Sequence, residues 1–393
     1  MIEELVINQL PAPTWNRLKM NETKLAGLEL PQDSCEPRVA LEGSVCLNKS
    51  KGSNCCGCSE KAQCAVHGTD FAKIAGGVGE AISSLGEGQK LRLVADAGKS
   101  VAAVTLRYAD NTSCYNQIEI EAKPGSDVTV LMTYISTAQA KGQASIQTKI
   151  DVAAGAKVKL VQVQLLGRDF LHINDVGSEL GTNAAFELLQ IQLGADKIYN
   201  GVRTELLGDA AFELLQIQLG ADKIYNGART ELLGESSDFK AAIGYYGRHG
   251  QTVDMNFIAN HYGKKTTCEM TADGVLQGGA KKIYRGTIDF KNGSAGAIGD
   301  EKETVLLLSD DVVNQTIPLI LCSEEDVQGN HGASIGKLDD ELLFYLCSRG
   351  FSEQEAVDMM AKAKIDALCR KIDDEDTVQL VQRYLEGVMA DGE

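Results

Sequence analysis

Residues 184–208 read AAFELLQIQLGADKIYNGVRTELLG, and residues 210–234 repeat this stretch as AAFELLQIQLGADKIYNGARTELLG, with Ala228 in place of Val202. Each copy holds an apolar strand, a Gly-Ala-Asp-Lys corner and a second strand in which apolar and polar residues alternate. Two strands joined by a corner make one coil of a β-solenoid. A solenoid accepts one more coil because the same strand stacking is restored on both sides of it. The duplication therefore favours a stacked, parallel β-helix.

Two other interpretations of the repeat stay open at this point. One copy could be extruded from the fold as a loop, although long structureless loops are uncommon in compact domains. The repeat could also be an artefact of how the sequence was assembled. The near-identity of the copies indicates a recent event, so the second copy need not serve the function.

The chain around the repeat has the same character from about Lys90 to Cys322. Short runs of alternating apolarity are separated by small and polar turn residues, as in Val101–Tyr108, Val128–Tyr134 and Val158–Leu166. The 393 residues include 40 glycines but only 6 prolines, and 44% are hydrophobic. That mixture is too rich in glycine for a helical bundle and too apolar for a disordered chain. It predicts a mainly β protein with many tight turns.

The two ends of the chain differ from this middle region. The first 30 residues suggest an arm with a short helix, residues 31–70 read as a loop, and the spacing over 71–86 suggests an amphipathic helix. Beyond Gly336 a helical period returns, and Ser352-Glu353-Gln354-Glu355 is a capping box. We therefore predict an N-terminal arm with a helical and loop region over 1–89, the β-helix over 90–336 and a C-terminal helical module over 337–393.

Charge and the N-terminus restrict the class of partner. The 38 Lys and Arg residues are outnumbered by 55 Asp and Glu residues, so the net charge of −17 disfavours binding to nucleic acid. The first residues are acidic rather than basic, and no apolar run is long enough to span a bilayer. We expect a cytoplasmic protein that does not bind membranes.

Eleven cysteines without an export signal favour thiols or metal ligands over disulfides. The densest group has a spacing that matches no standard zinc or ferredoxin pattern, and it comprises Cys55, Cys56, Cys58 and Cys64, with His67 close behind. These thiols could hold a soft metal or an iron-sulfur cluster, or they could form a redox-labile loop.

The sequence contains no H-E-x-x-H, no serine elbow and no P-loop, so no self-contained enzyme is visible. A polysaccharide-active β-helix enzyme would need acidic residues grouped on one face of the solenoid, and no such group can be placed from the sequence. A purely structural acidic solenoid is a further alternative. Cys322 and His331 stand out because they lie where the strand region gives way to the helices, although an isolated histidine is more often structural.

Three segments resemble the SufB/SufD family of iron-sulfur cluster assembly proteins. They are His331 to Gly350, HGASIGKLDDELLFYLCSRG, then Met255-Asn256-Phe257, and Tyr284 to Phe290, YRGTIDF. The opening Pro11-Ala12-Pro13-Thr14-Trp15-Asn16 is similar to the SufD branch. The resemblance implies a right-handed parallel β-helix flanked by terminal helical regions.

The resemblance also implies a function without catalysis by this chain. Family members pair as SufB and SufD through their β-helices, and each binds a SufC ATPase through its C-terminal helices, so ATP would bind SufC and not this chain. His331 corresponds to the functional histidine of the SufD branch, with Cys322 as a candidate second ligand for iron or a transient iron-sulfur cluster. The sequence leaves open whether a flavin binds. The apolar residues expected to dock SufC are Leu342, Leu343, Leu346, Met359, Met360, Val381, Tyr384 and Leu385.

Asn330 and Gly332 stand where the SufB branch has acidic residues, so SufD is the better match. Gly329 stands where some relatives carry a cysteine, which removes a Cys-x-His ligand pair. A SufB-like scaffold that holds the nascent cluster directly remains the alternative within the family.

Overall fold

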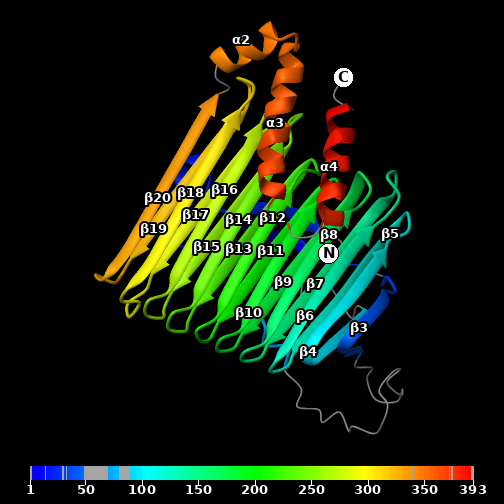
Figure 1. Ribbon diagram of the computed structural model, residues 1–393, viewed down its shortest axis with the longest axis vertical. Helices are drawn as coiled ribbons and strands as arrows, with labels where there is room; N and C mark the ends of the chain where they lie inside the picture. The colour runs from blue at the N-terminus through cyan, green and yellow to red at the C-terminus, as the bar shows by residue number, and fades with distance from the viewer. Residues whose placement is uncertain are drawn as a thin grey trace.

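The computed structural model describes residues 2–13, 15–28, 31, 33–47, 70–78, 89–337, 340–370, 372 and 375–390. Its body is a parallel β-solenoid, in which strands from successive coils lie side by side in two long sheets (Figure 1). This architecture confirms the mainly β solenoid expected from the repeat. Among the described residues, no helix has the length and apolarity that a membrane span requires.

The N-terminal elements are β1 (Ile2–Ile7), the 3-10 helix η1 (Asn16–Leu18), β2 (Thr23–Leu28) and β3 (Arg38–Leu47). The strands of the solenoid are β4 (Gln89–Arg107), β5 (Thr112–Ala122), β6 (Ser126–Ile135), β7 (Lys141–Val152), β8 (Lys157–Leu165), β9 (Asp169–Leu180), β10 (Ala185–Gln192), β11 (Lys197–Leu206), β12 (Ala211–Gln218), β13 (Lys223–Leu232), β14 (Asp238–Gly247), β15 (Thr252–His261), β16 (Thr267–Leu276), β17 (Lys281–Phe290), β18 (Ala297–Leu307), β19 (Val313–Cys322) and β20 (Val327–Lys337). The C-terminal helices are α2 (Asp340–Ser348), α3 (Glu353–Cys369) and α4 (Glu375–Ala390).

Each coil contributes one strand to each sheet. Even-numbered strands from β6 to β20 pair with one another in parallel, and odd-numbered strands from β5 to β19 do the same. Strand β4 belongs to both sheets, because residues 89–95 pair with β5 and residues 98–107 pair with β6. Gly98, with φ +108°, lies at this change of direction, where a side chain would be strained.

The duplicated residues form an additional coil in register. Strand β10 pairs with β12 so that Phe186 lies beside Phe212, and β11 pairs with β13 so that Tyr199 lies beside Tyr225. Neighbouring coils continue the same ladders, from β8 to β10 and from β12 to β14. Neither copy is extruded as a loop. An added coil of this kind lengthens the solenoid by about 4.8 Å, the spacing between strands.

The interior between the two sheets is mainly apolar, and its middle coils carry a ladder of buried amide side chains. Phe186, Phe212 and Phe239 stack in consecutive coils, with ring centroids 5.2 and 5.3 Å apart. Beside them runs a ladder of buried amides whose side chains hydrogen-bond along and across the two sheets, formed by Gln162, Gln190 and Gln216 from even strands and Asn174, Asn200 and Asn226 from odd strands. Buried amides of this kind must be paired, so the ladder fixes the register of the coils.

The expected N-terminal arm is a β-hairpin, in which β1 and β2 are antiparallel. It crosses the outer face of the odd-numbered strands. Leu5 and Leu25 pack near Tyr199, while Leu10 and Met20 cover Ile317 on β19. A salt bridge between Arg285 and Asp254 anchors the arm, because buried Arg285 also donates from Nε to the Met20 carbonyl at 2.6 Å.

Two expectations for residues 31–86 are wrong where the structure describes them. Part of the predicted loop is β3, which runs antiparallel to β4 and covers the first coil. Residues 71–78 form turns and not the start of a helix. Gly76 and Gly77 lie so close to β9 and β11 that a Cβ atom on either would clash with Asp175 or Val202, so this segment follows the sheet surface. The rest of the predicted helix lies outside the described residues.

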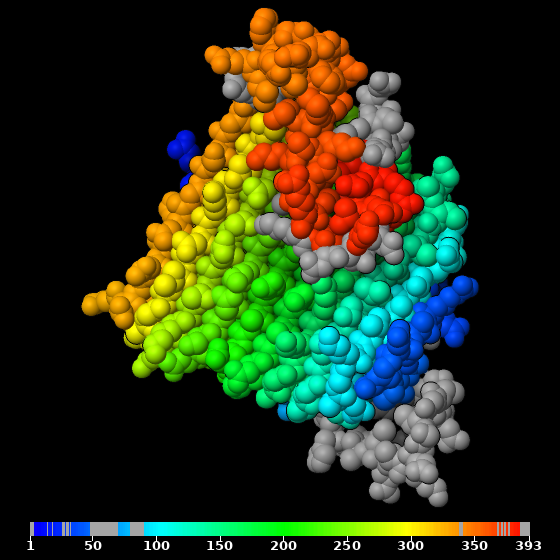
Figure 2. All heavy atoms as spheres, in the orientation of Figure 1, coloured from blue at the N-terminus to red at the C-terminus, as the bar shows by residue number. Residues whose placement is uncertain are grey.

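The C-terminal helices α3 and α4 lie on the outer face of the even-numbered strands, and α2 projects past the end of these strands (Figures 1 and 2). Ser352 and Glu355 form the predicted capping box at the start of α3, with Ser352 N donating to Glu355 Oε2 at 2.7 Å and Glu355 N donating to Ser352 Oγ at 3.2 Å. Ile365, Val381 and Leu385 are buried against apolar side chains of the sheet. The helices are therefore held by an apolar contact with the solenoid.

Candidate functional site

The last coil of the solenoid has no cover on its outer side. Strand β20 pairs only with β18 among the described strands, and every residue from Gln328 to Lys337 is exposed. Successive residues of a strand point to opposite faces, so exposure of all of them means that even the inward-facing side is uncovered. Ile335, for example, is 49% exposed. Figure 2 shows this strand along one margin of the molecule, away from α3 and α4. Natural proteins rarely leave a long strand edge unprotected, so this end is the candidate contact surface of the described residues.

His331 and Cys322 both lie in this last coil, on different sheets. His331 is exposed on β20, and its neighbour in register is Glu301 on β18. Cys322 is exposed at the end of β19, where its Sγ donates to the Glu324 carbonyl at 3.0 Å. The Cys322 thiol is therefore directed to the backbone of its own turn, and within the described segments no three His, Cys, Asp or Glu side chains converge on a metal site.

Behind His331 lie three buried charged side chains, Lys282, Glu301 and Glu303, which together with half-buried Thr316 are here called the terminal polar cluster. Lys282 forms a salt bridge with Glu303, with both side chains almost fully buried. Thr316 donates to Glu303 Oε2 at 2.6 Å and accepts from Lys282 Nζ at 3.0 Å. These bonds compensate for the burial of the charges.

Glu301 is the least satisfied member of the terminal polar cluster. Its Oε2 atom has no hydrogen-bond partner, and burial together with the charge of Glu303 raises the pKa of Glu301 to about 7. Burial also lowers the pKa of Lys282, although the adjacent Glu303 opposes this shift. The cluster therefore places an acid that titrates near neutral pH one strand away from His331.

Sequence reasoning missed the terminal polar cluster, although a signal was present. Glu301 and Glu303 alternate along β18, and their register neighbours on β16 are Met270 and Ala272, which belong to the apolar interior. Acidic residues at inward positions of a strand are costly and therefore informative. The alternation alone could not reveal that the interior near this end of the solenoid holds buried charged side chains, whereas the earlier coils hold the uncharged amide ladder.

The other described histidines on strands are structural. His172 is buried, and its Nδ1 lies 3.2 Å from the Ala144 carbonyl. His261 is also buried, with Nε2 3.2 Å from Cys268 Sγ. Burial lowers the pKa of both histidines to about 4 and raises the pKa of the Cys268 thiol. Neutral imidazoles beside a protonated thiol give no activated nucleophile.

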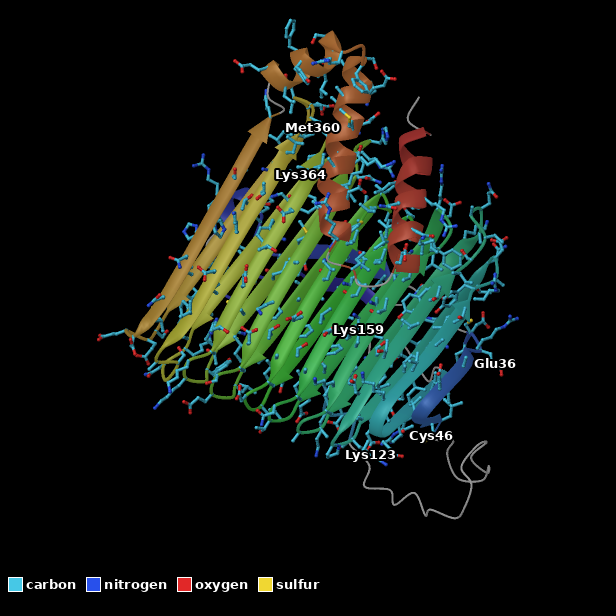
Figure 3. The ribbon with its side chains drawn as sticks, in the orientation of Figure 1. Glu36, Cys46, Lys123, Lys159, Met360 and Lys364 are labelled. Carbon is cyan, nitrogen blue, oxygen red and sulfur yellow. The ribbon has the colours of Figure 1, made fainter. Side chains whose placement is uncertain are left out.

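The residues predicted to dock SufC divide into two groups. Val381 and Leu385 are fully buried against the solenoid, Tyr384 is half-buried beside them, and Leu346 is buried in α2. Leu342, Leu343 and Met360 are half-buried, and Met359 is 38% exposed. Figure 3 places Met360 on α3, above the strand face. Val381 and Leu385 therefore pack against the solenoid in this structure.

Sequence reasoning did not single out the most exposed aromatic residues of the helical module. Phe344 is 76% exposed, Tyr345 is 51% exposed and Phe351 is 42% exposed. They lie on or just after α2, in the part of the module that projects past the sheet. The predicted metal ligands Cys55, Cys56, Cys58 and Cys64 lie outside the described residues.

The fold and the exposed end together define a parallel β-solenoid protein with an uncovered terminal strand. Residues 105–211 and 200–364 match the SufBD core domain of the SUF system for FeS cluster assembly. The two matched stretches meet within the duplicated coils, which is what an added coil would produce. The chain belongs to the SufB/SufD family of iron-sulfur cluster assembly proteins, and it is SufD-like.

Individual relatives agree with this family. The chain is 27% identical over 259 residues to the iron-sulfur cluster assembly protein SufD of Bacillus subtilis, which covers 65% of this chain and 53% of that protein. It is 29% identical over 139 residues to SufBD family proteins of Staphylococcus haemolyticus and Staphylococcus epidermidis, covering 35% of this chain and 30% of each relative. The chain thus matches about half the length of its Bacillus relative and less than a third of the staphylococcal ones.

Proposed function

We propose that this chain is the SufD-like subunit of a SufB-SufC-SufD assembly and that its uncovered terminal coil is the surface that pairs with a SufB-like subunit. The observation that carries the proposal is the exposure of β20 on both faces. A partner strand added to this edge would satisfy its backbone groups and cover the apolar side chain of Ile335. His331 would then lie at the junction of the two subunits.

The second contact in this proposal is with a SufC-like ATPase. Phe344, Tyr345 and Phe351 present aromatic surface on the projecting α2 region, and aromatic residues are enriched at interface centres. The chain itself neither hydrolyses ATP nor catalyses a reaction in this account. It supports the assembly of an iron-sulfur cluster, the cargo of the complex, and its transfer to acceptor proteins. In this proposal Cys322 and His331 contribute part of the coordination, and the partner supplies the rest.

Co-purification of the full chain with a SufB-SufC pair tests both contacts. Ile335→Glu should abolish SufB binding, because a charge would be buried in the new interface. Phe344→Ala combined with Tyr345→Ala should weaken SufC binding only. Leu131→Glu is a matched control, since Leu131 is 38% exposed on β6, far from both surfaces. Loss of binding in the control, or full binding in Ile335→Glu, would contradict the proposal.

A further inference from the structure

A cavity of about 300 Å³ lies on the outer face of the odd-numbered strands, away from the terminal coil. Its floor is formed by β11, β13 and β15, and its walls by the N-terminal arm at residues 6–9 and by residues 76–78. Gly201 and Gly227 lie side by side in the floor, so no side chain fills the space above this part of the strands. The surface is therefore hollow between the N-terminal arm and residues 76–78.

The charge of this cavity is opposite to that of the whole chain. Arg203 and Arg229 are the only charged residues among the described ones that line it, although the chain has a net charge of −17. The two arginines are neighbours in register, one strand spacing apart. Two guanidinium groups at this separation repel each other and together favour an oxyanion between them.

Acidic residues outside the cavity hold the arginines in place. Glu205 accepts from Arg203 Nε at 3.3 Å and from Nη2 at 2.9 Å, and Glu231 accepts from Arg229 Nε at 2.5 Å. Neither glutamate lines the cavity. Neither Nη atom of Arg229 has a hydrogen-bond partner within the described segments. The glutamates thus orient the guanidinium groups and leave donors for a ligand.

The remaining walls supply an aromatic contact and an acceptor without a partner. Tyr199 and Tyr225 line the cavity with ring centroids 5.2 Å apart and tilted by 46°. Asn256 is 6% exposed and donates from Nδ2 to the Gln9 carbonyl at 3.1 Å. Its Oδ1 atom is buried and has no partner. A buried acceptor in a cavity wall calls for a donor from whatever binds there.

We propose that this cavity binds a small ring-bearing phosphate monoester. The phosphate oxygens would accept hydrogen bonds from Arg203 and Arg229, a P–OH group would donate to Asn256 Oδ1, and the ring would contact the tyrosines. The volume is at the lower end of the range for ligand pockets, which restricts the ligand to about the size of an aryl phosphate. This site is independent of the pairing with SufB or SufC.

The cavity has two arginines, two tyrosines and two floor glycines because the coil is duplicated. The register neighbours of Arg203 and Arg229 in the flanking coils are Gly177 and Ile258, which carry no charge. Each copy contributes one arginine, one tyrosine and one floor glycine. Deleting one copy should therefore halve the site and leave the rest of the solenoid in register.

Binding of phenyl phosphate to the full chain, measured by isothermal titration and by saturation-transfer NMR, tests the proposal. Phenyl phosphate should bind at least about tenfold more tightly than inorganic phosphate or phenol, since each of these probes lacks one half of the contacts. Arg203→Gln combined with Arg229→Gln should weaken binding by more than about tenfold, as loss of the charged donors predicts. Asn256→Ala tests the acceptor without altering the charge.

Arg349→Gln is the matched control, because Arg349 lies over the Tyr345 ring at 5.1 Å in an arginine-tyrosine pair outside the cavity. It should bind phenyl phosphate as tightly as the unaltered chain. Circular dichroism of each variant establishes that the solenoid is folded. If the double arginine variant is unfolded, the binding of phenyl phosphate by Asn256→Ala and by the chain with one copy deleted decides whether the proposal stands. The proposal is overturned if the unaltered chain does not bind phenyl phosphate, or if the folded variants of the cavity bind it as tightly as Arg349→Gln does.

Discussion

The buried amide ladder predicts that the same substitution has different effects in the two copies. Asn200 and Asn226 occupy equivalent positions, but Asn200 is inside the ladder and Asn226 is at its end. Asn200 donates to Gln190 and Asn226, and it accepts from Asn174 and Gln190, which makes four hydrogen bonds of 2.7 to 3.2 Å. Asn226 makes two, at 2.7 and 2.6 Å.

The magnitudes follow from this difference. Asn200→Ala should cost about 4 kcal/mol of unfolding free energy and Asn226→Ala about 2 kcal/mol, at about 1 kcal/mol for each bond lost. Each substitution also leaves one acceptor without its donor, Asn226 Oδ1 in the first case and Gln216 Oε1 in the second. This shared cost cancels in the comparison, so the expected difference of about 2 kcal/mol comes from the two additional bonds.

Urea unfolding followed by circular dichroism measures both variants against the unaltered chain, and hydrogen exchange over β11 and β13 shows where the loss occurs. The expected result is a lower midpoint for Asn200→Ala, with faster exchange on both sides of the altered rung. Equal midpoints for the two variants would refute the ladder as the element that fixes the register of the duplicated coils.

Three further predictions follow from other parts of the molecule. Deleting residues 185–210, which joins Ala184 to Ala211 and leaves one copy, should give a folded solenoid about 4.8 Å shorter by small-angle scattering, whereas an aggregated or molten product would contradict the added-coil account. Glu301→Gln should remove a pH dependence of the unfolding free energy. The pKa of Glu301 is raised in the folded chain, so the unaltered chain loses stability as the pH rises from about 4.5 to about 7. At pH 8 the variant should be more stable by up to about 3.5 kcal/mol, from about 1.4 kcal/mol for each of the roughly 2.5 pH units in that window, and parallel stability curves from pH 4 to 8 would count against this assignment. Leu385→Ala should cost about 2 to 5 kcal/mol in urea unfolding because it empties a buried site against the sheet, while Met359→Ala should change stability by less than about 0.5 kcal/mol, and similar losses in both would argue against the packing described for α4.

The repeat and the strand alternation carried most of the fold prediction. Identical residues of the two copies lie beside each other, as Phe186 and Phe212 do, because stacked coils reproduce their own sequence. The capping box at Ser352 marked the start of α3 equally well, because it is a local device. Residues 71–78 were misread since their apolar spacing reflects contacts with the sheet, where Gly76 and Gly77 touch β9 and β11.

The candidate site was only partly predictable, because its surroundings also depend on contacts between strands that are distant in the sequence. The motif singled out His331 as a candidate, but the exposure of its whole strand depends on that strand being the last in the stack. The terminal polar cluster joins Lys282, Glu303 and Thr316 from three strands, so no local spacing reveals it. Val381 and Leu385 show the converse case, in which an apolar helix stripe predicts burial without saying whether the cover is the chain itself or a partner.

Hydrogen exchange over β19 and β20, compared between the chain alone and the chain with a SufB-like subunit, tests the central claim most directly. We expect fast exchange at the unpaired edge of β20 in the chain alone, and strong protection there once the partner is added, with β6 to β12 unchanged. Protection at α3 and α4 with no change in β20 would contradict the claim that the uncovered end of the solenoid is the pairing surface.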